Sequence, residues 1–347
     1  MIKYVKYYKD MGFFSKKIGI DLGTSNTLIY LSEKGIVLNE PSVVAISREE
    51  NKILAIGNKA KEMIGKTPGS IEAYTPIIDG VISNYKVTEI MLKYYINKAL
   101  PKFNIFKPDV MISVPSDISG TEKRAVIEIA LKAGAKNAYI VKEPVLAAIG
   151  AGIPIHESSG RIIVDIGGGV TDVAVISLGG IVNSKSIKCA GNKMNKSIME
   201  YIKKNHNLII GEQSAEEIKI EIGSALPLEE ELKIEIKGQD TVSGLPKTLE
   251  IKTNEIVKAI NKELKQIILV IKEVLQFTPP ELSRDIIDNG IIMTGGTSQL
   301  RYFPELVERK IGVNARLAND AIYCVSKGTG LTLTHLDVYK KSILNKR

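Results

Sequence analysis

The chain has no tryptophan, only two cysteines and only three histidines among its 347 residues. Cys189 and Cys324 lie far apart and form neither a disulfide framework nor a zinc-ligand spacing. His156, His206 and His335 likewise show no catalytic or metal-ligand pattern. No uninterrupted apolar run approaches the roughly 20 residues of a membrane-spanning helix. These absences argue against a disulfide-stapled, zinc-binding or membrane-spanning protein, and we expect a reduced cytoplasmic setting.

The composition is that of a globular chain, with 44% hydrophobic and 25% charged residues. Its length is enough for two domains with substantial cores. The net charge of +8 raises the question of nucleic acid or an anionic membrane as a partner. Lysines are spread through the chain, and their strongest cluster lies at the N-terminus. We therefore expect contact with an anionic membrane surface and none with nucleic acid.

Residues 1–17 form a candidate amphipathic segment that lies on a membrane. At about 100° per residue, Lys3, Lys6 and Asp10 fall on one arc of a helix, opposite apolar and aromatic side chains. A basic flank beside aromatic residues suits an anionic bilayer surface. A frayed or packed N-terminal extension remains an alternative. The candidate membrane contacts in this segment are Ile2, Val5, Phe13 and Phe14.

Two acidic, glycine-bearing turns, at residues 21–27 and 165–172, are the most informative feature of the chain. Each lies between two β-branched runs, which predicts strand, tight turn, strand. Glycine allows backbone N–H groups to approach phosphate oxygens. Asp21 and Asp165, at the entry of each turn, can hold Mg²⁺ through water. A single such turn could simply close a hairpin, whereas two copies predict one nucleotide site between them.

Neither turn fits a Walker loop or a dinucleotide fingerprint, because both of those open a helix. Strand-like and helical runs alternate along the chain, which indicates an α/β architecture. Helices are predicted over 87–99, 121–133, 194–205, 214–222 and 254–276. A third glycine-rich turn follows a strand near residue 293. Two halves that each start with an acidic turn predict a duplicated domain with the ligand between them.

Three motifs in this order, DLGT (21–24), DIGGG (165–169) and MTGG (293–296), resemble the superfamily of actin, sugar kinases and heat-shock chaperone ATPases. Other stretches resemble the MreB family of bacterial actin homologues within it. These are NEPSVVAI (39–46), MIGKTP (63–68), DGVI (79–82), KIEIG (219–223) and TPPEL (278–282). The resemblance runs from about residue 17 to the end. Its specificity comes from the combination, since each motif alone is weak.

The resemblance implies an α/β, actin-like ATPase fold of two duplicated domains, each with a small inserted subdomain, and a nucleotide in the central cleft. Domain I would cover 18–150, with its inserted subdomain at about 40–80. Domain II would cover 151–347, with its inserted subdomain at about 190–253. A C-terminal helix over about 325–347 would pack back on domain I.

The resemblance also implies ATP and Mg²⁺ as cofactors, held by four groups of residues. The first two groups would face the phosphates, the third would lie beside adenine and ribose, and the fourth would close over the base and α-phosphate. Without the resemblance, the third group would be interpreted as a solvated helical face. In chain order the groups are Thr24, Ser25 and Asn26; Gly167, Gly168, Gly169 and Val170; Glu216, Glu217, Ile218 and Lys219; and Gly295, Gly296, Thr297 and Ser298.

Hydrolysis would use Glu143 to orient a water, together with Asp21 and Asp165 at the metal. Glu143 precedes Pro144 at the start of a predicted helix, where a carboxylate is also favoured by the helix dipole alone. The chain departs from the family at Lys142, usually Glu, and at Val170, usually Thr. Val170 offers water no hydroxyl, and the Lys142 ammonium would lower the basicity of Glu143 if the side chains meet. We therefore expect nucleotide binding with slow hydrolysis.

The function implied is that of an ATP-dependent cytoskeletal protein whose filaments organise cell shape on the inner face of the cell membrane. Its partners would be further copies of itself, the anionic membrane and, as further candidates, paralogous subunits. Ile105 and Phe106 match an apolar loop that enters lipid in the family, although a buried loop contact remains an alternative. Two alternatives stay open for the function: a nucleotide-gated structural subunit with negligible hydrolysis, and a small-molecule kinase of the same superfamily.

Overall fold

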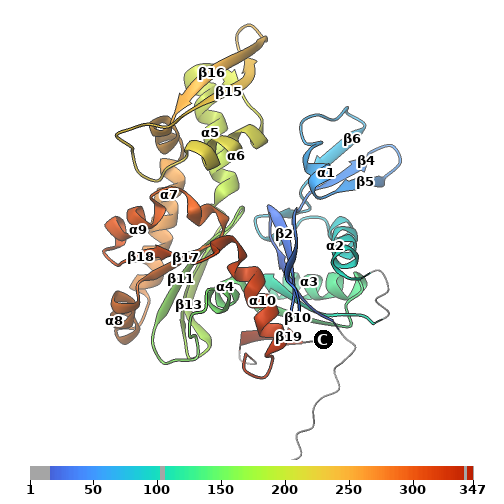
Figure 1. Cartoon of the computed structure of the whole chain (residues 1–347), viewed down its shortest axis with the longest axis vertical. Coiled ribbons are helices and arrows are strands. Elements are labelled where there is room, and N and C mark those ends of the chain that lie inside the picture. Colours follow the sequence, from blue (N-terminus) through green and yellow to red (C-terminus); the bar gives the residue numbers. More distant parts are fainter. Residues whose placement is uncertain (1–15, 102–105, 340–341, 347) are drawn as a thin grey trace, which may run out of the picture.

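The structure, a computed structural model, describes residues 16–101, 106–339 and 342–346. Five sheets are present in this part of the chain, two of them large, and each large sheet carries its own helices (Figure 1). No described helix is long and apolar enough to cross a membrane. The predicted membrane contacts Ile2, Val5, Phe13, Phe14 and Ile105 lie outside the described residues.

The first large sheet has the strand order β19-β10-β9-β1-β2-β3. β1, β9 and β10 run parallel, whereas β2 and β3 continue β1 as an antiparallel meander. The helices α2 (Tyr85–Ala99) and α3 (Gly120–Lys132) cover it, and their starts are capped by the Asn84 and Ser119 side chains. Its strands are β1 (Lys17–Leu22), β2 (Asn26–Leu31), β3 (Gly35–Pro41), β9 (Asp109–Val114), β10 (Asn137–Lys142) and β19 (Ile343–Lys346).

The second large sheet repeats that layout in the order β13-β12-β11-β17-β18. β11 pairs antiparallel with β12 and parallel with β17, as β1 does with β2 and β9. Its strands are β11 (Arg161–Ile166), β12 (Thr171–Ser177), β13 (Gly180–Ile187), β17 (Ile291–Thr294) and β18 (Ala315–Leu317). Its helices are α7 (Thr253–Gln276), α8 (Pro280–Asn289) and α9 (Phe303–Ile311). The two halves therefore place their acidic turns in equivalent positions.

Three smaller sheets lie beyond the large ones. In the first half these are β5-β4-β6 and the β7-β8 hairpin; in the second half it is β14-β15-β16. Their strands are β4 (Val44–Ser47), β5 (Lys52–Ile56), β6 (Ile71–Tyr74), β7 (Ile77–Ile78), β8 (Val81–Ile82), β14 (Leu208–Ile209), β15 (Lys233–Asp240) and β16 (Pro246–Lys252). The helices beside them are α1 (Asn58–Lys61), α5 (Gly191–His206) and α6 (Glu212–Ile222).

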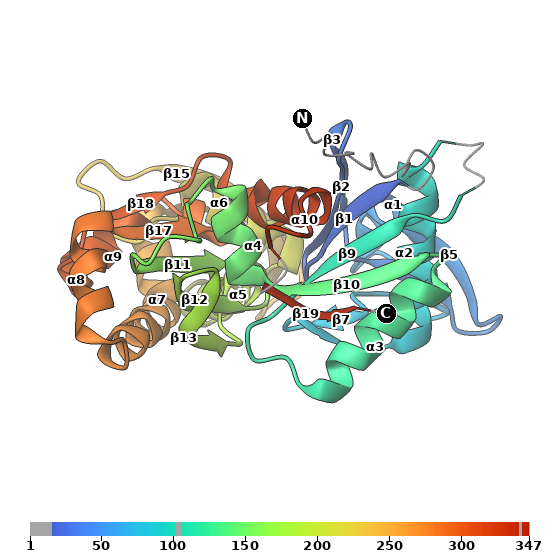
Figure 2. The ribbon, with the colours of Figure 1, turned by 90° about the horizontal axis from the view of Figure 1, so that it is seen from below.

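Two helices, α4 (Glu143–Gly150) and α10 (Cys324–Thr334), lie between the large sheets in both views (Figures 1 and 2). Their backbones touch, because a Cβ added to Gly150 would lie 1.8 Å from the Cys324 carbonyl oxygen. A Cβ on Gly328 would lie 2.0 Å from the Leu146 carbonyl oxygen. Glycine at these positions therefore permits the closest packing between the two halves.

The predicted helices are confirmed, with ends shifted by at most three residues. The exception is the C-terminal helix expected over about 325–347, which is wrong in extent. α10 ends at Thr334, and β19 (Ile343–Lys346) pairs antiparallel with β10 at the edge of the first sheet. The reason is that the β10 edge presents unpaired backbone groups, which an extended tail satisfies and a helix does not.

Candidate functional site

A cavity of about 750 Å³ lies between the two halves, where the turns after β1 and β11 face each other. One face of α6 and the turn after β17 complete its wall. The predicted residues that line it are Asp21, Thr24, Ser25, Asn26, Glu143, Asp165, Gly167, Gly168, Gly169, Val170, Glu216, Lys219, Gly295, Gly296 and Thr297. Most of the predicted site is therefore brought to one place.

The two glycine turns touch across the cavity. A Cβ added at Gly168 would lie 1.9 Å from Ser25 Oγ, and one at Gly169 would lie 2.6 Å from Thr24 Oγ1. The Thr24 hydroxyl oxygen accepts a 2.9 Å hydrogen bond from the Gly80 N–H, which leaves the hydroxyl hydrogen available to a ligand. Backbone and hydroxyl donors from both halves thus surround the same space, as a polyphosphate requires.

Asp21 and Asp165 occupy equivalent positions at the ends of β1 and β11. Asp21 accepts a 2.9 Å hydrogen bond from Ser113, and Asp165 accepts one of 2.8 Å from Thr294. Burial raises the pKa of Asp21 to about 6 and that of Asp165 to about 7. Asp165 is buried and Asp21 half-buried, and two such carboxylates in one cavity fit a hydrated divalent cation, because its charge would stabilise their ionised forms.

Glu143 is the first residue of α4 and lines the cavity beside both aspartates. Burial raises the Glu143 pKa well above its usual range, and the charges of Asp172, Asp21, Asp165 and Asp117 raise it further. A carboxyl group whose pKa is raised in this way is a stronger base and is suited to accept a proton from water.

The expected effect of Lys142 on Glu143 is wrong. Lys142 is not among the charges that shift the Glu143 pKa, which rises rather than falls. Burial and the charge of Lys123 lower the Lys142 pKa, while Asp172 and Asp117 oppose them. The two neighbours differ because the last strand residue and the first helix residue direct their side chains to different surroundings.

Only two of the four predicted residues on α6 line the cavity. Glu216 and Lys219 line the cavity, whereas Glu217 is exposed and Ile218 is buried in the core. The helical period explains this, since residues three and four apart share a face and Ile220 and Gly223 follow Glu216 into the wall. Burial lowers the Lys219 pKa to about 8, and its Nζ donates to the Gly191 carbonyl oxygen at 3.1 Å.

Of the predicted residues in the turn after β17, Gly295, Gly296 and Thr297 line the cavity and Ser298 does not. Gly295 has a φ of 85°, and a Cβ there would lie 2.3 Å from the Ile166 carbonyl oxygen, so only glycine fits. Thr297 donates a 2.7 Å hydrogen bond to the Gly167 carbonyl oxygen, which joins this turn to the second phosphate turn. Ser298 is fully buried, donates to the Gly295 carbonyl oxygen at 2.6 Å and does not line the cavity.

Several wall residues were not predicted. Asn192, at the start of α5, accepts a 3.1 Å hydrogen bond from the Ser25 hydroxyl. The Gly191-Asn192 pair at the start of an amphipathic helix was a usable local signal. Gly80, Arg301 and Ile322 also line the cavity, but they reach it from segments whose sequences carry no phosphate or base signature.

Two halves with one strand order, holding a cavity between their glycine turns, define an actin-like ATPase fold. The family model described as "MreB/Mbl protein" matches residues 15–341, and the chain belongs to the MreB/Mbl family. The resemblance predicted from the motifs is thereby confirmed.

The chain is 46% identical over 332 residues to the "Cell shape-determining protein Mbl" of Bacillus subtilis (strain 168), covering 96% of this chain and all of that protein. Its fold matches the crystal structure of MreB 5 of Spiroplasma citri bound to AMPPNP with a TM-score of 0.89, at 38% identity. That match covers 94% of this chain and 98% of the Spiroplasma chain. A MamK double helical filament shares the fold at 23% identity, with a TM-score of 0.79 over 93% of this chain and 99% of the MamK chain.

Proposed function

We propose that this chain binds ATP with Mg²⁺ in the cavity between its halves and assembles into membrane-associated filaments that organise cell shape. The observation that carries the proposal is the pair of glycine turns meeting across the cavity at Ser25 and Gly168. The Spiroplasma structure with the same fold holds AMPPNP, an ATP analogue. The cavity volume of about 750 Å³ is within the usual range of small-molecule sites.

In this proposal the chain contributes positioning and electrostatics to phosphoryl transfer, which needs little else. Hydroxyl and backbone donors of the two turns orient the phosphates. Asp21 and Asp165 would hold hydrated Mg²⁺, which would neutralise phosphate charge. Glu143 orients a water toward the terminal phosphate and accepts its proton.

Slow hydrolysis is part of the proposal, and Val170 supports it. Val170 lines the cavity but presents only methyl groups, so the second turn offers the water no hydroxyl. Lys142 no longer supports slow turnover, since its charge does not act on Glu143. The second candidate, a nucleotide-gated structural subunit without hydrolysis, rests on the same valine.

Self-assembly agrees with exposed apolar side chains near two elements of the second half, the β15–β16 hairpin and α8, which lie at opposite ends of it (Figure 1). Val242 and Leu245, in the turn between β15 and β16, are 83% and 64% exposed. Phe277 and Ile287, near α8, are 79% and 66% exposed. Apolar side chains at opposite ends suit head-to-tail contacts between copies.

For the membrane, the described surface offers Phe106, which is 49% exposed. Weak anchors act together when a filament repeats them, so each subunit needs only modest affinity. Removing residues 1–14 together with Phe106→Ser should abolish pelleting with anionic liposomes. Val182→Ser, at a 44% exposed position on β13, is the matched control. Undiminished pelleting of the first variant would remove the membrane from the proposal.

The nucleotide and filament parts are tested together by electron microscopy and binding measurements with ATP, ADP and no nucleotide. We expect submicromolar to micromolar affinity for ATP with Mg²⁺, filaments that depend on nucleotide, and loss of hydrolysis but not binding in Glu143→Gln. Filaments that depend on nucleotide but form without any phosphate release would favour the structural subunit. Absence of ATP binding in the wild type would overturn the proposal.

A further inference from the structure

The small outer parts of the two halves meet at Lys61, the last residue of α1. Its Nζ lies 2.9 Å from Glu216 Oε2 on α6, and its carbonyl oxygen accepts a 2.6 Å hydrogen bond from Gln213 Nε2. Gln213 and Glu216 are three residues apart and so share one face of α6. α1 and α6 face each other in Figure 1. Within the described residues, Lys61 and Glu216 form the one ion pair between these two parts.

Lys61 is held in place by the packing of α1. Ala60 is fully buried in a cluster with Val43 and Ala45. The Gly57 N–H donates to the Val43 carbonyl oxygen at 2.9 Å, and the Lys61 N–H donates to the Gly57 carbonyl oxygen at 2.9 Å. The Lys61 and Glu216 side chains are only 37% and 33% exposed. The pair is therefore more ordered and less solvated than an ordinary surface ion pair.

Glu216 stands between Lys61 and the cavity. Its Oε2 is engaged by Lys61, whereas no described residue donates a hydrogen bond to its Oε1. Glu216 lines the cavity. Lys219, one turn further along α6, donates its hydrogen bond to the Gly191 carbonyl oxygen. A carboxylate with one oxygen fixed by a lysine and the other unoccupied presents an oriented acceptor to a hydroxyl in the cavity.

We propose that Lys61 is a positioning residue for recognition of the nucleotide sugar. From the opposite half, it orients Glu216 so that the free carboxylate oxygen accepts a hydrogen bond from a ribose hydroxyl. Lys61 itself does not touch the nucleotide. Because the pair forms only when α1 and α6 approach, sugar recognition is coupled to closure of the two halves. The inference rests on the proposed binding of ATP in the cavity.

The test compares binding of Mg-ATP, 2′-deoxy-ATP and 3′-deoxy-ATP to the wild type and to Lys61→Met. The wild type should favour ATP over at least one deoxy analogue by about 10-fold, the usual effect of a hydrogen bond to a charged group. Lys61→Met should lower ATP affinity by about 5- to 10-fold and reduce that preference to within about 2-fold. ATP should also dissociate faster in stopped flow.

Two further variants separate positioning from general loss of charge or fold. Lys59→Met removes an exposed lysine from the same helix and should leave both affinity and preference unchanged. Lys61→Arg keeps a charged donor and should restore the preference to within about 2-fold of the wild type. Thermal unfolding of Lys61→Met and Lys59→Met should agree within about 1 °C, since an ion pair with both side chains about one third exposed contributes little stability.

The outcomes distinguish this inference from the function on which it rests. A wild type that binds no ATP would overturn both. A wild type that binds and selects ATP, with the same selectivity in Lys61→Met, would overturn the role of Lys61 alone. Equal weakening by Lys59→Met would also overturn it, because the effect would then be one of net charge.

Discussion

The Ser25 hydroxyl of the first half donates a 3.1 Å hydrogen bond to Asn192 Oδ1 of the second, directly over Gly168. The contact joins the first phosphate turn to the start of α5. It leaves no room for a side chain at Gly168, where a Cβ would lie 2.8 Å from Ser25 Cβ as well as 1.9 Å from its hydroxyl oxygen. The two turns can therefore act as one cradle only while position 168 is glycine.

Gly168→Ala should accordingly weaken ATP binding by at least about 10-fold, because the added methyl separates the turns by part of an ångström or more and phosphate contacts depend on that spacing. Isothermal titration with Mg-ATP measures the change. Gly120→Ala, at an open position in the first turn of α3, is the control and should bind like the wild type. Wild-type affinity in Gly168→Ala would show that the turns do not hold the nucleotide jointly.

The raised pKa values of Asp21 and Asp165 predict how stability changes with pH. A carboxyl group with a folded pKa above its unfolded value of 3.8 binds protons more tightly in the folded state. The group's contribution to the free energy of unfolding is therefore greatest below pH 3.8. That contribution is lost as the pH rises through about 6 for Asp21 and about 7 for Asp165. The melting temperature of the ligand-free protein should therefore fall by several degrees between pH 5 and pH 8.

Mg-ATP should reduce that fall, because the bound cation stabilises the ionised carboxylates. Asp165→Asn should also reduce it in the ligand-free protein, since the asparagine does not titrate. Differential scanning calorimetry at several pH values follows both effects. A pH profile identical in Asp165→Asn and the wild type would mean that other groups dominate the titration.

Val170→Thr should raise the rate of ATP hydrolysis by about 10-fold, less than the roughly 100-fold or more that a full proton-transfer group supplies, because the added hydroxyl would only help to orient the water. Threonine matches valine in shape and adds a hydroxyl inside the cavity. Phosphate release at saturating ATP measures the rate, and Val182→Thr on exposed β13 is the control. Turnover of the wild type equal to that of a relative with threonine at this position would contradict the idea.

The sequence predicts those parts of the site whose functional residues lie close together along the chain. Asp21 with its turn, and Asp165 with its glycines, carry strand, turn and acidic residue within a few positions, so local rules are enough. Periodicity could also have resolved α6, because apolar Ile218 and exposed Glu217 leave Glu216 and Lys219 on the remaining face.

The rest depends on the tertiary structure. Lys61 contacts Glu216 from a segment far away in the chain, and nothing in the sequence around Lys61 indicates this partner. The C-terminal strand was missed for a related reason: its conformation is set by the free edge of β10 rather than by local propensity. The outcome at Lys142 was likewise decided by the direction of its side chain, which sequence spacing does not give.

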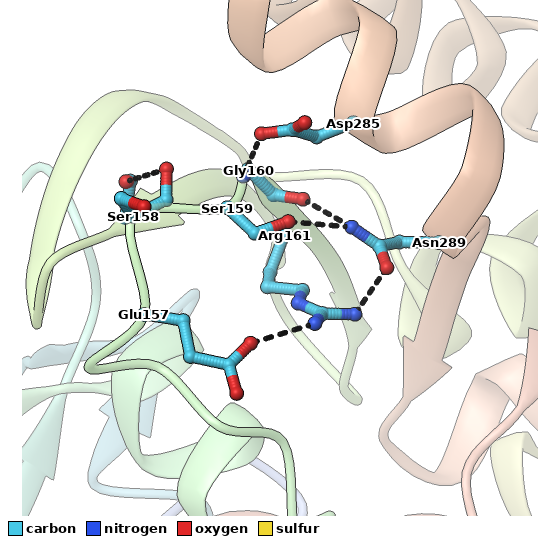
Figure 3. A network of polar contacts seen from close by, with 8 residues as sticks. Glu157, Ser158, Ser159, Gly160, Arg161, Asp285 and Asn289 are labelled. Atoms are coloured by element: carbon cyan, nitrogen blue, oxygen red, sulfur yellow. Dashed lines mark hydrogen bonds and ion pairs between the residues drawn. The ribbon is translucent and has the colours of Figure 1, made fainter.

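The loop before β11 is bound to the end of α8 through Asn289 (Figure 3). Asn289 accepts a hydrogen bond from the Arg161 guanidinium and donates to Ser159 Oγ and the Gly160 carbonyl oxygen, each at 3.0 Å. Asp285 accepts one of 2.7 Å from the Gly160 N–H. The Arg161 Nε is buried without a described partner, so this guanidinium depends on Asn289 and Glu157.

Asn289→Ala should therefore destabilise the protein by about 2 kcal/mol, because it leaves a largely buried arginine and a carbonyl group short of partners. Ser158→Ala, at an exposed neighbouring position, should have no measurable effect. ATP affinity should stay unchanged in both variants, since Arg161 begins β11 and the phosphate turn follows the other end of that strand. Chemical denaturation gives the first quantity and nucleotide titration the second. A loss of affinity without a loss of stability in Asn289→Ala would show that this end of the sheet acts on the nucleotide site rather than on the fold.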